Sequence, residues 1–383
     1  MSQPITIRTI NNASSKELNT FIYFAWEVYK GNPYWVPPML MDIRKTLNKT
    51  KNAFFQRAEM QLFMAYEGDR PVGRIAAIKN DLHNETHKDK TGFFGFFECI
   101  NKQEVANILL DAARQWLKER GMDYVIGPAN PSINHEFGLL TEGFDDSPRL
   151  MMTYNPPYYI TLLENYGFKN VKNLLAYKID QQHVLDNPQF GRIANAVRQR
   201  TGIKVRSINM KKIKEEVKLV KEIYNAAWRD PDFGGYNWNA IPLTDAEIAE
   251  LAEVLVPLAN PDLVIFGEIG DKVVAFALCM PDYNYIFKQM NGRLFPFNFI
   301  KLFTQRKKIE WARIIILGVL PEYQRRGLDA VMYREIVERS RKIGIKYGEA
   351  SWILEDNLPM RRAAEEVMSG TVYKKYAAFG MAI

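Results

Sequence analysis

The sequence has few of the side chains that bind structural metals or form disulfide bonds. Its 383 residues include 2 cysteines and 4 histidines. Cys99 and Cys279 lie far apart in apolar runs, with no CxxC pair and no histidine cluster beside them. We therefore expect no disulfide framework and no metal site, and we predict that both cysteines are buried free thiols.

Long apolar segments are also missing from the sequence. No stretch approaches the roughly 18 uncharged apolar residues that a membrane-spanning helix needs. The first residues, MSQPITIRTI, lack the basic segment, apolar core and small-residue cleavage site of a secretory signal. These absences predict a protein without a transmembrane segment, located in the cytoplasm.

The excess of positive charge is small for a chain of this length. The 51 lysines and arginines give a formal net charge of +7 against 44 acidic residues, and they are spread along the sequence. Such a mild excess is typical of a solvated surface and predicts no DNA partner. With 47% hydrophobic and 25% charged residues, the composition is that of an ordinary folded protein.

The length and the order of elements both indicate two domains. A chain of 383 residues exceeds what one hydrophobic core usually serves. Periodicity and turn residues predict a strand, two helices, a hairpin, then alternating strand, helix, strand, helix and strand in each half. The first half has 5–10, 21–29, 39–47, 61–66, 71–79, the apolar run 92–99, 102–120, 124–127, 156–166 and 172–178; the second has 204–208, 211–228, 244–256, 263–268, 272–280, 313–319, 327–342, 348–353, 359–368 and 372–379.

This repeated order predicts an α/β fold in which a mixed sheet carries helices on both faces. Because the order occurs twice, we expect two tandem domains of the same fold. The segment 180–195 is polar and contains Pro188, which suits a boundary. The predicted domains are 1–185 and 186–383.

The most informative motif is a buried strand, Ile314–Val319, followed by a polar turn and an amphipathic helix. A strand that enters a helix through such a turn points successive backbone N–H groups at one spot, where the helix dipole also favours an anion. Arg325 and Arg326 add positive charge, and Gly327 has no Cβ to block a close approach. The motif therefore predicts a pyrophosphate site.

This segment resembles the signature of the GNAT N-acetyltransferase superfamily, Gln/Arg-x-x-Gly-x-Gly/Ala, which binds the pyrophosphate of acyl-CoA. In that family the preceding strand splays from its neighbour and hydrogen-bonds the pantetheine arm, and an Asn before the next helix forms a second cofactor motif. The resemblance implies acetyl-CoA or another acyl-CoA as co-substrate, without a metal. It assigns the cofactor to Leu317, Gly318, Val319, Gln324, Arg325, Arg326, Gly327, Leu328, Asp329, Ala330 and Asn357.

One position departs from the family pattern. Asp329 stands where the family has Gly or Ala. A carboxylate in the first turn of a helix can accept hydrogen bonds from the helix amides itself, or it can repel phosphate. Either effect weakens cofactor binding unless the side chain turns away.

The first half resembles the same superfamily at its end but not at its phosphate turn. Residues 155–168 place an Asn before a helix that ends in Glu-Asn-Tyr-Gly-Phe, as in the family. The corresponding turn, 98–104, has no Gly and contains Glu98 and Glu104. We therefore expect the first half to have the fold without the cofactor, as a scaffold or substrate-binding half. In its loop 127–140, a ligand role and a structured loop capped by Asn and Ser are both open; the second is favoured, and His135 and Glu136 alone form neither a triad nor a metal site.

The chemistry of the family is direct attack of an amine on a thioester, which needs a base for the amine proton and an acid for the thiolate. The helix 359–368 carries no Tyr, although the family's acid is often a Tyr there. The nearest candidates are Glu355, Glu349, Tyr373 and Tyr376. Because the two tyrosines differ by three in a strand, they face opposite sides. Our hypothesis is Tyr373 as acid and Glu355 as base.

Two further segments have open roles. Residues 283–308 mix aromatic and basic side chains, which suits a lid over a long acyl chain, a membrane-surface contact or, as the favoured interpretation, a cover on the sheet. The aromatic cluster from Trp228 to Trp238, with Asp230 and Asp232, suits either an acceptor pocket or a core loop.

The function predicted from these features is an acyl-CoA-dependent N-acyltransferase, such as an acetyltransferase, that acts on a small-molecule or peptidic amine. One alternative is a tandem-GNAT transferase that takes an aminoacyl group from tRNA, resembling the peptidoglycan-bridge enzymes; only this alternative involves RNA. Another is a non-catalytic acyl-CoA-binding protein. The acceptor, the acyl length and the oligomeric state depend on pocket and surface shape, so they stay open.

Overall fold

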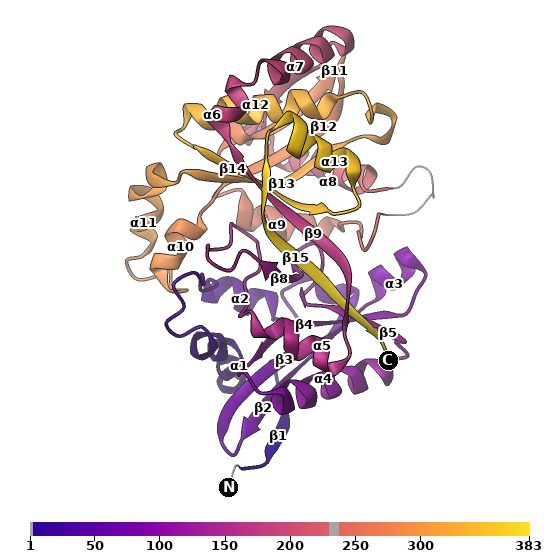
Figure 1. Ribbon diagram of the computed structural model, residues 1–383, viewed down its shortest axis with the longest axis vertical. Coiled ribbons are helices and arrows are strands. Elements are labelled where there is room, and N and C mark those ends of the chain that lie inside the picture. The colour runs from indigo at the N-terminus through magenta and orange to yellow at the C-terminus, as the bar shows by residue number, and fades with distance from the viewer. Residues whose placement is uncertain (1–2, 230–236) are drawn as a thin grey trace. The chain divides into compact units, whose positions relative to one another are not determined.

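The computed structural model describes residues 3–229 and 237–383 and contains two compact units (Figure 1). Unit 1 comprises Met1–Asn173, Phe287–Leu294 and Lys375–Ile383, and unit 2 comprises Leu174–Ile286 and Phe295–Lys374. The units are groups of residues that lie together in space, whereas the predicted domains 1–185 and 186–383 follow the repeat in the sequence. That division stays a prediction.

Unit 1 is a mixed sheet whose strands follow the order β1, β2, β3, β4, β5 and the end of β15, with β8 also pairing with β15. All neighbours among these strands are antiparallel except β4 and β5. The elements are β1 (Ile5–Ile10), α1 (Ser15–Val28), α2 (Leu40–Thr46), η1 (Ala53–Gln56), β2 (Ala58–Glu67), β3 (Arg70–Asn80), α3 (Asp81–His87), β4 (Thr91–Cys99), α4 (Gln103–Lys118), β5 (Tyr124–Gly127), β6 (Ala129–Asn130), β7 (Glu136–Phe137), β8 (Leu139–Glu142), α5 (Tyr158–Tyr166) and the start of β9 (Lys169–Asp180).

Unit 2 has the strand order β10, β11, β12, β13, β14 and the end of β9. Here β13 and β14 are the parallel pair, and the other neighbours are antiparallel. The elements are α6 (Gln181–Asp186), α7 (Pro188–Thr201), β10 (Lys204–Ser207), η2 (Met210–Lys212), α8 (Ile213–Ala227), α9 (Asp245–Leu255), η3 (Pro261–Leu263), β11 (Val264–Ile269), β12 (Lys272–Pro281), the start of α10 (Asn284–Met290), α11 (Phe299–Thr304), η4 (Arg306–Lys308), β13 (Trp311–Val319), η5 (Pro321–Tyr323), α12 (Leu328–Lys342), β14 (Tyr347–Leu354), α13 (Leu358–Arg362), η6 (Ala363–Val367) and the start of β15 (Thr371–Ala382).

The predicted α/β class, with a mixed sheet and tandem units of one fold, is confirmed. Each unit has a single parallel pair among these strands, and in each a helix, α4 or α12, connects the two parallel strands. The helices are amphipathic as the sequence predicts. Val105, Leu109 and Ala113 of α4 enter the core of unit 1, while Tyr333 and Val337 of α12 pack against β9 and β14 in unit 2.

The segment 180–195 forms helices rather than an extended connection. Asn187 caps α7 by accepting a hydrogen bond from the Gln189 N–H at 3.0 Å, and Pro188 occupies the first helical position. Proline is favoured there because that N–H has no partner within the helix. The composition that suggested a boundary is therefore also that of a helix start.

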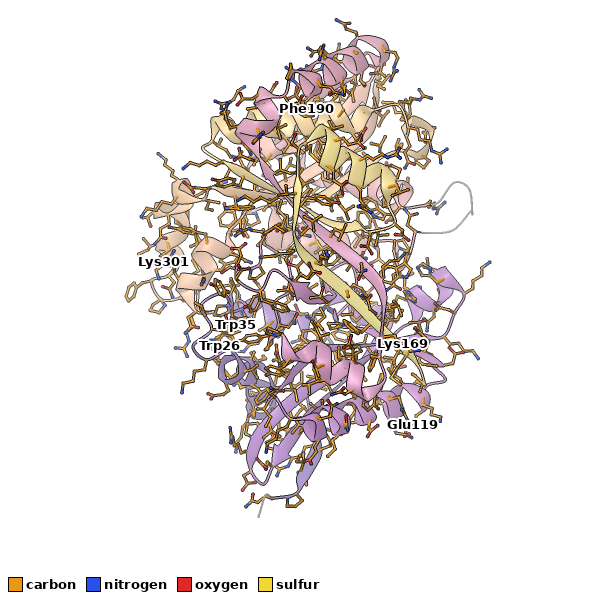
Figure 2. The ribbon with its side chains drawn as sticks, in the orientation of Figure 1. Trp26, Trp35, Glu119, Lys169, Phe190 and Lys301 are labelled. Atoms are coloured by element: carbon orange, nitrogen blue, oxygen red, sulfur yellow. The ribbon has the colours of Figure 1, made fainter. Side chains whose placement is uncertain are left out.

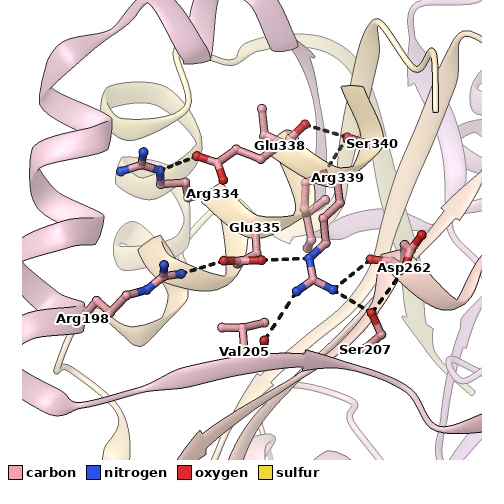
Figure 3. Close-up of polar contacts among 11 residues, drawn as sticks. Arg198, Val205, Ser207, Asp262, Arg334, Glu335, Glu338, Arg339 and Ser340 are labelled. Atoms are coloured by element: carbon pink, nitrogen blue, oxygen red, sulfur yellow. Dashed lines mark hydrogen bonds and ion pairs between the residues drawn. The ribbon is translucent and has the colours of Figure 1, made fainter. Parts of the chain in front are cut away.

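Polar contacts attach α12 to its neighbours in unit 2 (Figure 3). Glu335 accepts from Arg198 of α7 at 2.7 Å and from Arg339 at 2.8 Å. Arg339 in turn donates to Ser207 Oγ at the end of β10 at 2.9 Å. Because Glu335 joins two arginines into one network, the helix that follows the predicted phosphate turn is held from two sides.

Both cysteines are free and buried, as predicted. Burial raises the pKa of each thiol to about 12, so neither is a thiolate near neutral pH. Within the described part of the chain, no helix is both long enough and apolar enough to cross a bilayer.

Candidate active site

The parallel strands β13 and β14 separate part of the way along their length. They pair from Trp311 with Tyr347 as far as Ile314 with Ala350, whereas β13 stays paired with β12 until Val319. The backbone of 315–319 therefore borders the opening between the two parallel strands. Peptide groups along such an edge can hydrogen-bond an extended ligand, and the predicted cofactor residues Leu317, Gly318 and Val319 lie on it.

The turn after β13 leads into α12 through residues with left-handed backbone. Arg325 has φ +58° and Gly327, the N-cap residue, has φ +77°. A Cβ on Gly327 would lie 3.0 Å from Val197 Cγ2, so both the backbone and the space around this position favour glycine. The side chains of Arg325 and Arg326 are exposed. The helix N-terminus thus has positive charge beside it, which suits an anion.

Asp329 lies in the first turn of α12 and is half-buried. Burial raises the pKa of its carboxyl above the usual range, and the neighbouring backbone amides of Ala330 and Asp329 partly offset this rise. In the same turn the Ala330 N–H donates to the carbonyl of Gly327 at 3.1 Å. Which of the two effects expected from this departure applies stays a prediction.

Gln324 binds the protein's own backbone. Its Nε2 donates to the carbonyl of Val319 at 3.0 Å and to that of Ala227 at 3.3 Å, so the side chain joins the turn to the end of β13 and to the end of α8. Asn357 caps α13, where its side chain accepts from the Met360 N–H at 3.2 Å. Cofactor roles for both residues stay predictions.

Tyr373 contacts a buried carboxylate near the start of β14. Its hydroxyl donates to Oε2 of Glu349, which is fully buried. Ser351 donates to the other oxygen, Oε1, at 2.6 Å, and Arg313 donates to Ser351 Oγ at 2.9 Å. Arg313 also lies 3.5 Å from Oε1 of Glu349 as an ion pair. Both charges are buried and hydrogen-bonded, which is the condition under which a buried ion pair is tolerated.

The structure places the predicted acid, Tyr373, and the predicted base, Glu355, in different surroundings. Tyr373 contacts Glu349. From the sequence, Glu349 was a candidate but not the residue that we predicted as the base. Glu355 is exposed beyond the end of β14, and its backbone carbonyl accepts from Arg361 at 3.1 Å. Tyr376 is fully buried. Arg313 and Ser351 were not predicted from the sequence, although Ser351 lies two residues from Glu349 and so shares its face of the strand.

Aromatic rings surround Tyr373. Its ring stacks on Trp311 with centroids 5.9 Å apart, and Trp311 lies 5.1 Å from Tyr347. Lys178 Nζ lies 4.7 Å from the Tyr347 centroid. The packing fixes the orientation of the phenol while the residue stays half-exposed.

Unit 1 has the same separation of parallel strands, but its own side chains occupy the edge. Pairing of β4 with β5 ends at Phe93 with Ile126, while β4 pairs with β3 as far as Cys99. Asn130 accepts from the Phe96 N–H at 2.6 Å, and Tyr159 accepts from the Cys99 N–H at 2.8 Å. These are the backbone groups that an extended ligand would need.

Glu98, at the start of the turn that lacks glycine, is also used internally. It accepts from Tyr159 at 2.7 Å and from Tyr29 at 3.4 Å, and it lies 3.5 Å from Arg74. Tyr29 stacks on Trp35 with centroids 4.7 Å apart, and Trp35 meets Trp26 edge to face at 5.2 Å (Figure 2). A carboxylate placed here opposes an anionic ligand.

The loop 127–140 has the geometry of a structured loop. His135 is half-buried, its Nδ1 lies 2.9 Å from Ser132 Oγ, and that oxygen accepts from the Asn134 N–H at 3.2 Å. Burial lowers the pKa of His135 to about 4, so the ring is neutral near pH 7. Among the described residues, no group of three or more His, Cys, Asp or Glu side chains is arranged to hold a metal ion.

The aromatic cluster from Trp228 to Trp238, for which an acceptor pocket and a core loop were both open, lies only partly within the described residues. Trp228 stacks on Tyr224 with centroids 4.6 Å apart and lies against Gly318. Asp230 and Asp232 lie outside the described residues.

Comparison with known proteins gives matches over the whole chain. The model of the acetyltransferase (GNAT) family matches residues 220–368. Protein YghO of Escherichia coli K12 is 31% identical over 379 residues, which cover 97% of this chain and 94% of that protein. A bacterial ceramide synthase of Caulobacter vibrioides is 33% identical over 374 residues, which cover 96% and 95%.

Solved structures share the fold at low sequence identity. A tandem GNAT protein from the clavulanic acid biosynthesis pathway aligns with a TM-score of 0.58 at 11% identity, over 99% of this chain and 98% of that one. A GCN5-related N-acetyltransferase from Sphaerobacter thermophilus aligns with a TM-score of 0.50 at 12% identity, over 100% and 97%.

Proposed function

Since the chain belongs to the acetyltransferase (GNAT) family and is therefore an acyltransferase, we propose that it transfers an acyl group from acyl-CoA directly to an amine, with CoA bound by unit 2. The observation that carries this proposal is the opening between β13 and β14, which leads to the glycine turn and two exposed arginines at the start of α12. In unit 1 the corresponding backbone is occupied by Asn130 and Tyr159.

The pantetheine arm of acyl-CoA would lie along the backbone of Leu317, Gly318 and Val319. The pyrophosphate would lie over Gly327, with Arg325 and Arg326 supplying charge. Acyl-CoA supplies the thioester, an activated acyl group. The protein binds and orients the two substrates and moves one proton between them.

In the transfer the amine nitrogen forms a bond to the thioester carbonyl carbon and the carbon–sulfur bond breaks. One proton leaves the amine and one reaches the thiolate. Tyr373 suits this exchange because its phenol oxygen can accept the amine proton while its own hydrogen passes to Glu349, and the reverse delivers a proton to the thiolate. Arg313 and Ser351 hold the carboxylate in place, so Glu349 exchanges its proton with Tyr373 and does not itself touch the substrate.

For the acceptor, the name of the Caulobacter relative supplies the chemical class. A ceramide is the amide of a fatty acid with a long-chain amino alcohol, so an enzyme that makes it acylates an amine. With 33% identity over almost the whole chain, the same class is the acceptor that we propose here, with a fatty acyl-CoA as donor.

Isothermal titration of acetyl-CoA and palmitoyl-CoA into the purified chain tests the cofactor site. We expect binding that Arg325→Ala/Arg326→Ala weakens at least tenfold and that Gly327→Glu abolishes. The matched control is Arg341→Ala, an exposed arginine in the last turn of the same helix. Because Gly327→Glu can disturb the fold, the arginine variant carries the test. Absence of binding to the wild type would overturn the proposal.

Release of free CoA with sphinganine or ethanolamine as acceptor tests the reaction. Faster turnover of the long-chain amine supports the proposed acceptor class. Transfer that requires aminoacyl-tRNA would replace the proposal with the tRNA-dependent alternative. Acyl-CoA binding without transfer to any amine would replace it with the non-catalytic one.

A further inference from the structure

The segment 295–308 of unit 2 exposes large aromatic side chains. Phe295, Phe297 and Phe303 are 69%, 74% and 78% exposed, and Ile300 and Phe299 are also exposed. Single exposed apolar residues are common on proteins, but five within nine positions form a patch that needs a covering partner. Phe299 and Phe303 are four apart on α11, so they share one face of the helix.

The preceding part of the same insertion behaves differently. Tyr283 and Ile286 are buried in unit 2. The sequence favoured the interpretation that residues 283–308 form a cover on the sheet. That interpretation fits the beginning of the insertion, whereas the rings of 295–303 face solvent. A structural role in the core does not explain them.

Positive charge accompanies this aromatic patch. Residues 295–308 contain Lys301, Arg306, Lys307 and Lys308 and no acidic residue. The last three are exposed, and Lys301 is labelled in Figure 2. A protein partner would be expected to meet aromatic rings in a pocket of matching shape, while a bilayer accepts rings and cations together, because the rings enter the interface and the cations meet lipid phosphates.

We propose that residues 295–308 dock the protein onto the surface of an anionic lipid bilayer. Phe295, Phe297 and Phe303 insert at the boundary between headgroups and acyl chains, and the basic residues contact lipid phosphates. This inference does not depend on the acyl acceptor. Two weak signals act together, since short apolar insertions and small basic clusters each bind membranes only marginally.

Sedimentation of the full-length protein with vesicles tests the docking. We expect binding to vesicles of phosphatidylglycerol and phosphatidylcholine, at least tenfold weaker binding to phosphatidylcholine alone, and a loss of binding in high salt. Phe297→Ser/Phe303→Ser and Lys307→Glu/Lys308→Glu should each reduce binding at least tenfold. The control Arg341→Glu/Lys342→Glu makes the same charge change at exposed positions of α12 and should bind like the wild type.

Three outcomes would overturn the proposal: no binding of the wild type to anionic vesicles, binding that the Phe and Lys variants retain, or equal loss in the α12 control. Sedimentation velocity adds a fourth. A wild-type dimer that Phe297→Ser/Phe303→Ser converts to a monomer would assign the patch to a second copy of the chain. Binding of acetyl-CoA should be the same in the patch variants and the wild type, so failure of docking is distinguishable from failure of the cofactor site.

Discussion

The hydroxyl of Tyr373 donates a hydrogen bond to Oε2 of Glu349, a carboxylate with no exposed surface. The phenol itself is half-exposed, while Arg313 and Ser351 hold the other side of the carboxylate. Tyr373 is thus the accessible end of a buried charged network. Changes at its two ends should therefore have different effects, one on the chemistry and the other on stability.

Tyr373→Phe removes only the hydroxyl that we assign to proton transfer. We expect kcat to fall about 10²-fold or more, the usual contribution of a general acid or base, with little change in acyl-CoA affinity. Steady-state kinetics and titration measure the two quantities. Tyr166→Phe removes a hydroxyl bound to Asp111 in unit 1 and should leave kcat unchanged. A wild-type kcat in Tyr373→Phe would rule out the assignment.

Glu349→Ala leaves the Arg313 guanidinium buried without its carboxylate. Removal of one partner of a buried ion pair costs about 3–5 kcal/mol, and apolar replacement of both is far better tolerated. We expect Glu349→Ala to lower the free energy of unfolding by that amount and Arg313→Met/Glu349→Leu to lower it much less. Denaturant unfolding measures both. A double variant less stable than Glu349→Ala would show that the charges favour the fold.

Asp329 should make acyl-CoA binding depend on pH. Burial raises its pKa, so the folded protein holds this proton to a higher pH than the unfolded chain does. The carboxyl is neutral below that pKa and negative above it, so wild-type affinity for the phosphates should fall as the pH rises through it. Asp329→Asn should bind acyl-CoA about tenfold more tightly at pH 7. Its affinity should not show the fall with rising pH that is expected of the wild type. Titration across pH 4–8 measures it; equal affinities at pH 7 would contradict it.

His135 should make the fold sensitive to acid. Its folded pKa of about 4 lies below its ordinary value of 6.5, so the unfolded chain takes up the proton first as the pH falls. The stability is present above about pH 6.5 and is lost toward pH 4, at up to roughly 1.4 kcal/mol per pH unit. His135→Gln should flatten this dependence, while the exposed His183→Gln should not. Denaturant unfolding at several pH values is the measurement, and unchanged slopes would contradict the prediction.

The sequence by itself determined the order of elements, and it predicted where a phosphate turn would lie. Both depend on local signals: apolar residues at helix or strand spacing predict the elements, and Gly327 beside two arginines at the start of a helix predicts the turn. The departure from the family pattern at Asp329 could also be recognised from the sequence, because a carboxylate in the first turn of a helix binds the helix amides, repels an anion or turns away. Even the free, buried cysteines followed from their apolar surroundings.

Only the tertiary structure decided which side chains meet. Arg313, Glu349 and Tyr373 come from β13, β14 and β15, and their contacts depend on strand register and on where β13 and β14 separate, neither of which has a local signal. For the same reason Glu355 was preferred over Glu349. The exposure of the phenylalanines in 295–303 could not be predicted from the sequence either, because the segment has the composition of a core segment. Only the packing around a ring determines whether it is buried or exposed to solvent.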